Sequence, residues 1–356
     1  MNIGIVGCGN IAPIYLGNLR DRFAPVVAVK ACADLDPERA RLRASEFPGV
    51  EAAPLADLLA DPDIGLILNL TTPQGHCEVA RQALEAGKHV YNEKPLALSP
   101  DEGKELVRLA QARGLRIGAA PDTFLGAGLQ ACLRLLDEGA IGEPVAAQAF
   151  MLCRGHEHWH PNPDFYYKTG GGPLFDMGPY YLTALVALLG PVRRVTASAR
   201  ASFPERIIAS EPRRGERIRV ETPTHIVGVL EFAAGQIASL TTSFDTQASQ
   251  APRIELFGSK ATLSLPDPNT FGGPVRLRAA DDEEWRETPV TGPYAENARG
   301  LGVADMAAAI AEGRPHRASG ELALHVLDIM RALLEAAEQG RHIEIGTTCA
   351  RPPAME

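Results

Sequence analysis

The sequence predicts two domains, an α/β domain on a doubly wound parallel sheet and an α+β domain on an open, mainly antiparallel sheet. A chain of 356 residues is long for a single domain. In the first ~120 residues, strand-like runs alternate with helical stretches, as a parallel sheet requires. Between residues 223 and 266, alternating runs follow one another across short turns, which is typical of antiparallel strands. We expect domains at 1–121 and 122–346, with a poorly ordered tail at 347–356.

The first domain should contain parallel strands joined by helices. The run at 64–71 is apolar almost throughout, which indicates a strand buried on both faces. Pro37 occupies the favoured first position of a helix, and Gly87 follows the end of another helix as a C-cap. We expect strands at 3–6, 26–34, 64–71 and 115–121, and a strand with its exit loop at 88–95. Helices are expected to end near residue 22 and to span 37–47, 76–86 and 101–114.

The second domain begins with a helical pattern at 129–139 and then changes character. The turn at 258–261 reads GSKA between two alternating runs and predicts a hairpin. The remaining pattern favours a sheet with helices on one face. We expect strands at 144–153, 224–232, 236–244, 253–258 and 261–265, and closing helices at 303–313 and 321–340.

Composition and charge restrict the class of function. Apolar residues make up 45% of the chain and charged residues 22%, as in ordinary globular proteins. A net charge of −9 argues against binding to nucleic acid or to an anionic membrane surface. The six cysteines show no C-x-x-C spacing, which favours reduced thiols. Without a signal segment or an apolar run of membrane-spanning length, a cytoplasmic location is expected.

A glycine-rich turn follows the first strand and precedes the first helix. It reads G-x-G-x-x-A, and its glycines allow a tight turn that brings the backbone close to a pyrophosphate. The helix N-terminus adds free N–H groups and its dipole. The alternative is a plain strand-to-helix turn, which the strand–turn–helix context disfavours. The expected cofactor contacts here are Gly7, Gly9, Asn10, Ile11 and Ala12.

Asp34 ends the second strand, 22 residues after Ala12. A carboxylate at this place can accept hydrogen bonds from an adenosine ribose diol and repels a 2′-phosphate. The cofactor predicted is therefore NAD, with NADP as the less favoured alternative. Asp36 is interpreted as the cap of the helix that begins at Pro37.

Polar residues also follow the third strand, where the carboxyl ends of parallel strands face the ligand crevice. Thr71, Thr72, Pro73 and His76 are expected to contact the cofactor. The alternative is an N-capped turn in which Thr71 or Thr72 satisfies the N–H groups of the helix, and the two interpretations are compatible.

The triplet Glu93-Lys94-Pro95 follows the next strand along the chain. A strand-end lysine in a loop stiffened by proline is suited to handling a substrate proton, and close to a positively charged nicotinamide it could act in neutral form. The alternative is a solvated surface lysine. Lys94 is predicted to be catalytic, and Glu93 and Lys94 are both expected near the cofactor.

A second group of polar residues follows the segment Gly170–Gly172. If this segment is helical, Asp176 and Tyr180 are four residues apart and share a face. Pro179 removes a helix hydrogen bond, which predicts a kink or a helix that begins near Gly178. The structural alternatives are a cap for Asp176 and half-buried packing for Tyr180.

Three histidines, His156, His158 and His160, form H-x-H-x-H. On a strand this spacing could place imidazoles on one metal ion. The following Trp159-His160-Pro161-Asn162-Pro163 favours an irregular loop, and companion ligands are missing, so no metal site is predicted. Trp159 and His160 are instead expected to contact a sugar, and Asp122 is counted with them as a substrate contact.

Taken together, these motifs resemble the family of glucose–fructose oxidoreductase, inositol dehydrogenase and MocA-like proteins. The resemblance spans nearly the whole chain and rests on GCGNIA, ADLD, NLTTPQGH, AGKHVYNEKPLAL and GGGPLFDMGPYY, in that order. It implies an N-terminal Rossmann domain, a C-terminal domain whose open sheet commonly forms dimers or tetramers, and hydride transfer between nicotinamide and a sugar or polyol carbinol.

The resemblance also assigns roles to single residues. Lys94 matches the catalytic lysine of the family, and Asp176 matches the acidic residue of its GGG segment. Many members carry a histidine where this chain has Tyr180, whereas the glucose–fructose oxidoreductase branch carries tyrosine. The resemblance thus implies that Asp176 and Tyr180 act in catalysis and contact the substrate, and it leaves the proton acceptor open between Lys94 and Tyr180.

The favoured hypothesis is an NAD-dependent sugar or polyol dehydrogenase that forms a homodimer or homotetramer. A nonenzymatic NAD(H)-binding sensor of the same fold is the alternative, and the intact Glu93-Lys94-Pro95 triplet speaks against it. A metal-dependent lyase or hydrolase built on the three histidines is the weakest hypothesis. The sequence leaves open which sugar and which carbon react.

Overall fold

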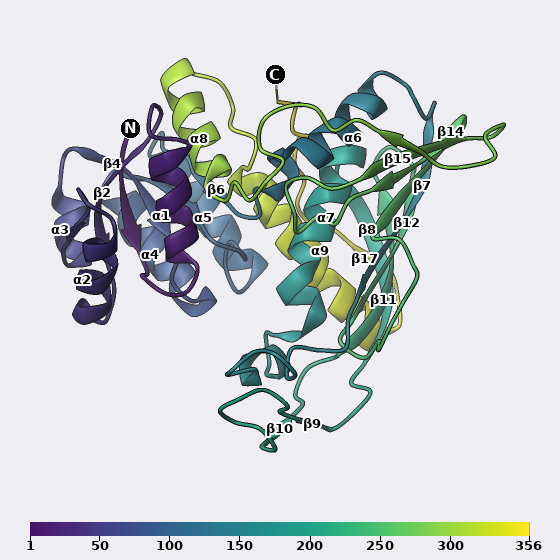
Figure 1. Cartoon of the computed structure of the whole chain (residues 1–356), viewed down its shortest axis with the longest axis horizontal. Coiled ribbons are helices and arrows are strands. Elements are labelled where there is room, and N and C mark those ends of the chain that lie inside the picture. The colour runs from purple at the N-terminus through teal and green to yellow at the C-terminus, as the bar shows by residue number, and fades with distance from the viewer. Residues whose placement is uncertain (356) are drawn as a thin grey trace. The chain divides into compact units, whose positions relative to one another are not determined.

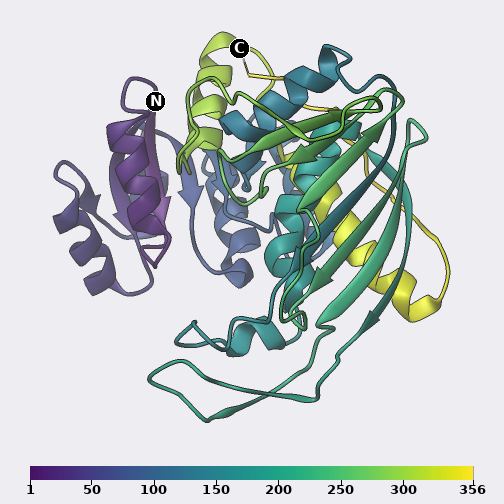
Figure 2. The same cartoon turned by 45° about the vertical axis from the view of Figure 1, so that its right-hand side comes forward.

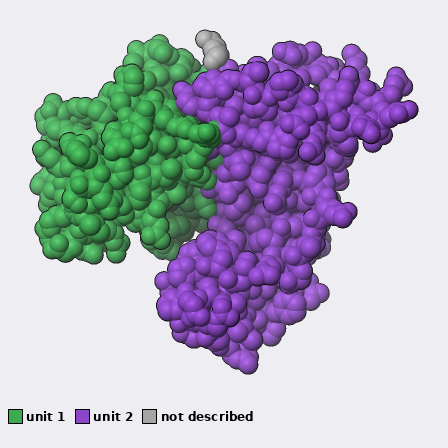
Figure 3. Space-filling view, in the orientation of Figure 1, with its two compact units in different colours: residues 1–125, 296–327 green, residues 126–295, 328–356 purple. Residues whose placement is uncertain are grey.

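The computed structural model describes residues 1–355, which form two compact units (Figure 3). Unit 1 comprises residues 1–125 and 296–327, and unit 2 comprises residues 126–295 and 328–356. The segment 296–327 was expected in the second domain, but it belongs to unit 1. The reason lies in its packing, because its helix α8 (Leu301–Glu312) contacts β6 (Ile117–Ala119), and Gly118 bridges to Ser319. No local sequence pattern announces such a return of the chain.

Within residues 1–355, unit 1 holds a six-stranded parallel sheet with the order β3-β2-β1-β4-β5-β6. Because β1 lies between β2 and β4, the strand order reverses beside β1, and this is where such sheets bind ligands. The predicted doubly wound sheet is confirmed. The expected strands omitted β3, which has only two residues. Besides β6, the strands of this sheet are β1 (Asn2–Val6), β2 (Ala28–Ala33), β3 (Glu51–Ala52), β4 (Ile64–Asn69) and β5 (His89–Asn92).

The helices of unit 1 begin at residues that favour helix starts. Asp36 accepts a hydrogen bond from the Glu38 backbone, as predicted for a cap, and Ser99 with Glu102 forms a capping box. The helix expected from His76 begins three residues earlier, because Pro73 fits the first turn, where no N–H partner is needed. The helices are α1 (Ala12–Asp21), α2 (Pro37–Glu46), α3 (Leu55–Ala60), α4 (Pro73–Glu85), α5 (Pro100–Ala112) and the short 3₁₀ helix η1 (Thr123–Leu125).

Unit 2, as far as the structure describes it, is built on a nine-stranded sheet with the order β16-β15-β14-β13-β7-β12-β11-β8-β17. Its neighbouring strands are antiparallel except for the parallel pair β7 and β12, which confirms an open, mainly antiparallel sheet. A separate hairpin is formed by β9 (Glu205–Ile207) and β10 (Arg217–Arg219). The sheet strands are β7 (Pro144–Leu152), β8 (Val192–Arg200), β11 (His225–Phe232), β12 (Ile237–Ser243), β13 (Ile254–Gly258), β14 (Ala261–Leu265), β15 (Val275–Ala279), β16 (Arg286–Thr288) and β17 (Ile343–Glu344).

One face of this sheet is covered by helices, as Figures 1 and 2 show. Helix α7 (Gly172–Leu189) packs on β7 and β12, and α6 (Ala127–Asp137) packs on β14. Leu333 of α9 (Gly320–Gln339) packs over Gly228 of β11. The alternation along β11 follows from this arrangement, since its even-numbered residues are buried and its odd-numbered residues are not.

The end of the chain differs from the expected poorly ordered tail at 347–356. The Thr347 hydroxyl donates to Asp328 (2.9 Å), and the Arg351 guanidinium contacts Asp137 (2.7 Å). The Met355 backbone donates to Gln130 (2.6 Å), while Glu356 lies outside the described residues. These contacts place residues 347–355 against unit 2, which a polar, proline-containing sequence did not reveal. Among the residues described, no helix is both long and apolar enough to cross a membrane.

Candidate active site

The glycine-rich turn at the end of β1 is shaped by backbone crowding on one side and open space on the other. Gly7 has a positive φ of 101°, and a Cβ there would lie 2.6 Å from the Leu70 backbone, so only glycine fits. A Cβ on Gly9 would meet nothing within 4 Å. Within residues 1–355, no side chain caps the start of α1 at Ile11. The turn therefore offers uncapped N–H groups beside open space, which fits a pyrophosphate.

A cavity of about 820 Å³ in unit 1 adjoins this turn. Its volume is in the range of cofactor sites. The carboxyl ends of β1, β2 and β4 all contribute to it, at the place where the strand order reverses. The lining includes Gly7, Gly9, Asp34, Leu35, Thr71 and Thr72. Five of these six were predicted from the sequence as cofactor contacts, and the structure brings them to one cavity.

Asp34 is held in one orientation at the edge of this cavity. Its side chain is 8% exposed. One carboxylate oxygen accepts from the Cys8 backbone N–H at 2.8 Å, and the other accepts from the Asp36 backbone N–H at 2.9 Å. Arg39 approaches to 3.6 Å from the first turn of α2. The carboxylate is thus fixed by the same turn that carries the glycines.

Thr71 and Thr72 lie at the end of β4. The Thr71 hydroxyl donates to the Asn69 side chain at 2.7 Å. Thr72 occupies the N-cap position of α4, and in the described chain its side chain makes no cap hydrogen bond. Pro73 begins α4. The hydroxyl of Thr72 is not used to cap the helix.

His76 does not occupy the cofactor-facing position that was predicted for it. Its side chain is completely buried, with Nδ1 at 2.6 Å from the Pro95 carbonyl and Nε2 at 3.1 Å from the Thr71 carbonyl. Burial lowers the pKa of His76, and the two carbonyls oppose this effect. The ring lies between the end of β4 and the loop that carries Lys94.

Two buried asparagines join the same two segments and were missed by the sequence reasoning. The Asn69 amide donates to the Asn92 side chain at 3.1 Å, and the Asn92 amide donates to the Leu96 carbonyl at 2.9 Å. Both residues are fully buried at the ends of adjacent strands. The sequence signal for such a role was a polar residue at the end of an otherwise apolar strand.

Glu93 holds the loop in place through both of its carboxylate oxygens. One oxygen accepts from the buried Tyr15 hydroxyl at 2.7 Å, and the other accepts from the Lys94 backbone N–H at 2.9 Å. Burial raises the pKa of Tyr15 well above its usual value. The Lys94–Pro95 peptide bond is cis, and Lys94 itself is partly exposed. Glu93 thus fixes the backbone of Lys94.

Asp122 was expected to contact substrate, but the structure assigns it a different role. Its side chain is 1% exposed, and one oxygen accepts from the backbone N–H groups of Gly300 (2.9 Å) and Gly302 (3.0 Å). These are the groups at the start of α8. Asp122 therefore holds α8 within unit 1. Burial raises its pKa to about 6, although the two backbone N–H groups act in the opposite direction.

The raised pKa of Asp122 predicts a pH-dependent loss of stability. Below about pH 4 the carboxyl is protonated in both the folded and the unfolded state, so it does not lower the free energy of unfolding. Between about pH 4 and 6 it ionises more easily in the unfolded chain, and above pH 6 its ionisation costs up to ~3 kcal/mol. Asp122→Asn keeps an oxygen for both N–H groups and removes this charge.

We expect Asp122→Asn to gain stability relative to the wild type as the pH rises from 4.5 to 7. Denaturant unfolding of both proteins at these two pH values measures the difference. A stability difference that stays constant with pH would contradict the assignment.

Helix α7 carries Asp176 and Tyr180 in unit 2. It begins at Gly172 and continues through Pro179, so the predicted start near Gly178 is wrong. Gly172 has a φ of 86°, and a Cβ there would lie 2.8 Å from the Pro223 carbonyl, which explains a glycine at this start. Pro179 lies in a helix that is buried almost throughout, and tertiary packing outweighs the lost hydrogen bond. Tyr180 is buried and Asp176 is partly exposed.

The histidine loop lies in unit 2 between β7 and α7 and is irregular, as predicted. His156 Nε2 lies 2.9 Å from an Asp176 oxygen, so this histidine faces the predicted catalytic carboxylate. His160 Nδ1 accepts from the Asn162 backbone at 3.0 Å, and burial lowers the pKa of His158 and His160. Trp159 is 55% exposed. Within the described part of the chain, the residues form no cluster of metal-ligand type.

The sequence considered His156 only as a metal ligand and missed its pairing with Asp176. The two residues are 20 positions apart in the sequence. The only signal for their contact was a histidine in the loop that precedes the GGG segment. Lys94 belongs to unit 1, whereas Asp176, Tyr180, His156, Trp159 and His160 belong to unit 2.

Comparisons with known proteins agree with this description. Residues 1–120 match the family described as "Oxidoreductase family, NAD-binding Rossmann fold", and residues 129–264 match the "GFO/IDH/MocA C-terminal domain". An uncharacterized oxidoreductase of Rhizobium meliloti is 30% identical and covers 96% of this chain, with 98% of its own length aligned. The 1,5-anhydro-D-fructose reductase of Ensifer adhaerens is 27% identical over 97% of this chain and 98% of its own length.

A solved structure shares the fold. Levoglucosan dehydrogenase in complex with NADH and L-sorbose superposes with a TM-score of 0.82 at 21% identity, covering 98% of this chain and 99% of that protein. The predicted fold class and NAD-binding domain are thereby confirmed. By these matches across both domains, the chain belongs to the GFO/IDH/MocA family of NAD-binding oxidoreductases.

Proposed function

We propose that this protein transfers hydride between NAD(H) and a hydroxyl-bearing or carbonyl carbon of a sugar, glycoside or polyol. The observation that carries the proposal is the cavity in unit 1, where the glycine turn and the fixed Asp34 carboxylate lie together. The names of the relatives, 1,5-anhydro-D-fructose reductase and levoglucosan dehydrogenase, support a carbohydrate substrate.

Each group of residues has a separate role in the proposed reaction. The N–H groups at the start of α1 hold the cofactor diphosphate, and Asp34 accepts hydrogen bonds from the adenosine ribose. Lys94 and Tyr180 hydrogen-bond the reacting hydroxyl, and one of them takes its proton as the carbonyl forms. Asp176 orients the substrate. A bound nicotinamide would supply the hydride acceptor, so that one C–H bond and one O–H bond of the substrate would break for each carbonyl made.

NAD is proposed over NADP because of the charges around the ribose position. Asp34 disfavours a 2′-phosphate. Arg39, which could pair with such a phosphate, lies within 3.6 Å of Asp34 and 3.9 Å of Asp36 and is therefore compensated by two carboxylates. The preference rests on Asp34.

A panel of sugars, polyols and glycosides tested with NAD and with NADP checks the proposal. Absorbance of the reduced nicotinamide should increase with at least one substrate, and more strongly with NAD. If NAD binds but no member of the panel is oxidised and no matching ketone or aldose is reduced, the nonenzymatic sensor becomes the better description.

The histidine loop is proposed to serve the substrate. Exposed aromatic side chains suit the apolar faces of sugar rings, and Trp159 with His160 supplies such a surface beside Asp176. We expect His160→Ala to raise KM for the sugar by about tenfold, the size of one lost hydrogen bond, with little change in NAD affinity. Steady-state kinetics with each substrate varied measures this. A larger effect on NAD than on sugar would contradict it.

A homodimer or homotetramer through the sheet of unit 2 is also proposed. Val227, Val229 and Ile237 are exposed on the sheet face opposite the helices, at 41%, 37% and 53%. Apolar side chains gathered on one face favour burial against a second copy. Light scattering on the purified protein measures the assembly, and a monomer at micromolar concentration would contradict it.

A further inference from the structure

The Asp176 carboxylate has a histidine as its neighbour within unit 2. His156 Nε2 lies 2.9 Å from Asp176 Oδ2, and the two side chains are only 13% and 18% exposed. A neutral imidazole carries one proton, so it is either a donor or an acceptor toward this carboxylate. The hydrogen bond made by the other ring nitrogen, Nδ1, determines whether Nε2 donates or accepts.

Trp159 fixes the position of that proton. Its indole N–H lies 3.2 Å from His156 Nδ1, and an indole nitrogen can only donate. Nδ1 must therefore carry a lone pair, and the proton of the neutral ring must sit on Nε2. His156 consequently donates to Asp176 and presents no acceptor to it. An imidazolium, with a proton on each nitrogen, would lose the Trp159 hydrogen bond.

Three aromatic rings pack around the imidazole of His156 and restrict its rotation. The ring centroids of Tyr166, Phe244 and Trp159 lie 4.4, 4.7 and 5.2 Å from that of His156. The ring therefore has neighbours on several sides and has little freedom to flip. The direction in which Nε2 donates is fixed by packing as well as by Trp159.

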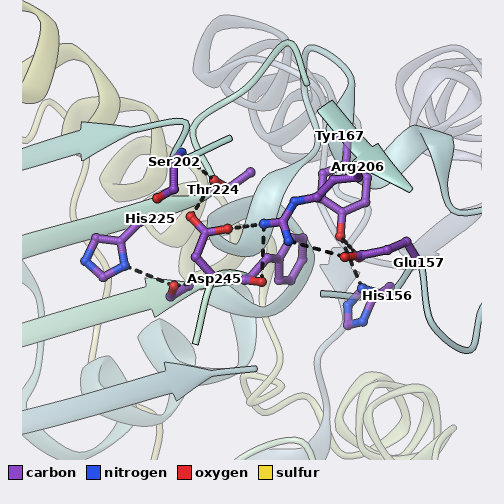
Figure 4. A network of polar contacts seen from close by, with 10 residues as sticks. His156, Glu157, Tyr167, Ser202, Arg206, Thr224, His225 and Asp245 are labelled. Carbon is purple, nitrogen blue, oxygen red and sulfur yellow. Dashed lines mark hydrogen bonds and ion pairs between the residues drawn. The ribbon is translucent and has the colours of Figure 1, made fainter. Parts of the chain in front are cut away.

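A buried charge network anchors the backbone of this loop, as Figure 4 shows. The His156 backbone N–H donates to the Tyr167 hydroxyl at 3.3 Å, and this hydroxyl donates to Glu157. Glu157 pairs with Arg206 at 3.2 Å, and Arg206 also pairs with Asp245. Burial and the Glu157 carboxylate raise the pKa of Tyr167, so it remains a donor.

We propose that His156 and Trp159 are positioning residues that hold Asp176 as an oriented, ionised hydrogen-bond acceptor for a substrate hydroxyl. The proposal rests on the function proposed above, in which Asp176 orients the substrate. A neutral His156 with its proton on Nε2 stabilises the carboxylate without neutralising it. Trp159 prevents the tautomer that would instead draw a proton onto Asp176. Neither residue needs to touch the reacting atoms.

Three variants of the 356-residue chain test the proposal. His156→Phe keeps an aromatic ring and removes both nitrogens, and His156→Gln restores a donor. Trp159→Phe keeps an aromatic side chain and removes the indole N–H. His342→Phe is the matched control, since His342 also lies near a carboxylate, 3.7 Å from Glu231, but on an exposed part of unit 2.

We expect His156→Phe to lower kcat by about 10- to 100-fold, as loss of an orienting partner typically does, with NAD affinity unchanged. His156→Gln should recover most of this loss, and His342→Phe should match the wild type. If an active wild type is matched by His156→Phe in both kcat and sugar KM, the positioning role is wrong. A wild type that oxidises no sugar refutes the proposed function instead.

The tautomer provides a readout that does not depend on turnover. In histidine-labelled protein, ¹⁵N NMR should show His156 with a protonated Nε2 and a bare Nδ1, its signals being assigned by their loss in His156→Gln. Trp159→Phe should allow a proton onto Nδ1 as well, while Nε2 still donates to Asp176. A protonated Nδ1 in the wild type, or an Nδ1 that stays bare in Trp159→Phe even in acidic solution, overturns the inference even where His156→Phe fails to fold.

Discussion

Lys94→Met is expected to lower kcat by about 10²–10⁴-fold, the usual contribution of a general acid or base. Methionine keeps much of the bulk of the side chain and removes the ammonium group. Lys94 follows the buried end of β5, and its backbone is held by Glu93, so a change of side chain should not move the loop. NAD affinity should therefore stay within a few-fold of the wild type. Steady-state kinetics and NADH fluorescence titration measure the two quantities.

Tyr180→Phe is the matched comparison, because it removes one hydroxyl from a buried ring on α7. If tyrosine only orients the substrate hydroxyl, its loss should cost less than that of Lys94. If tyrosine is the base, the two losses should be similar. Near-normal kcat in Lys94→Met, on a substrate that the wild type oxidises, would remove the mechanism proposed here.

Asp34→Ser is expected to shift the preference from NAD toward NADP by tenfold or more. A charged hydrogen-bond pair contributes on the order of 1.5–3 kcal/mol, and tenfold corresponds to about 1.4 kcal/mol. The substitution also releases Arg39 from one of its two carboxylate neighbours, which leaves it better able to pair with a 2′-phosphate. Cofactor Kd and kcat/KM for NAD and NADP measure the shift.

Asp36→Ser is a suitable control for this change. Asp36 also lies near Arg39 but caps α2, and serine is an equally good cap. It should leave the cofactor preference close to that of the wild type. In Asp34→Ser combined with Arg39→Ala, the gain in NADP use should disappear. A wild type that binds NADP as tightly as NAD would contradict the role of Asp34.

Local sequence was enough to predict those parts of the fold whose cause is local. The apolar run of β4, the cap at Asp36 and the turn at Gly7 each depend on neighbouring residues. Strand β3 was missed because two residues carry no periodic pattern. The return of segment 296–327 to unit 1 was missed because it depends on packing between distant segments.

The positions of the site residues, too, were predicted where they depend on neighbouring residues and missed where they depend on distant ones. Gly9 and Asp34 line the predicted cavity, since the backbone of one turn places them. Asp122 was misread because its partner Gly300 lies 178 residues away, and the contact of Glu93 with Tyr15, 78 residues away, was not foreseen. A carboxylate looks the same in the sequence whether it faces a ligand or a buried N–H group. Only the fold reveals which groups remain for chemistry.

The proposed function requires direct hydride transfer from a carbinol carbon to the nicotinamide. The most direct test uses the best substrate of the panel with deuterium in place of the hydrogen on its reacting carbon. Mass spectrometry of the NADH formed should show one deuterium per molecule, on one face of the nicotinamide C4. NADH without the label, or label found only in solvent water, would contradict the account.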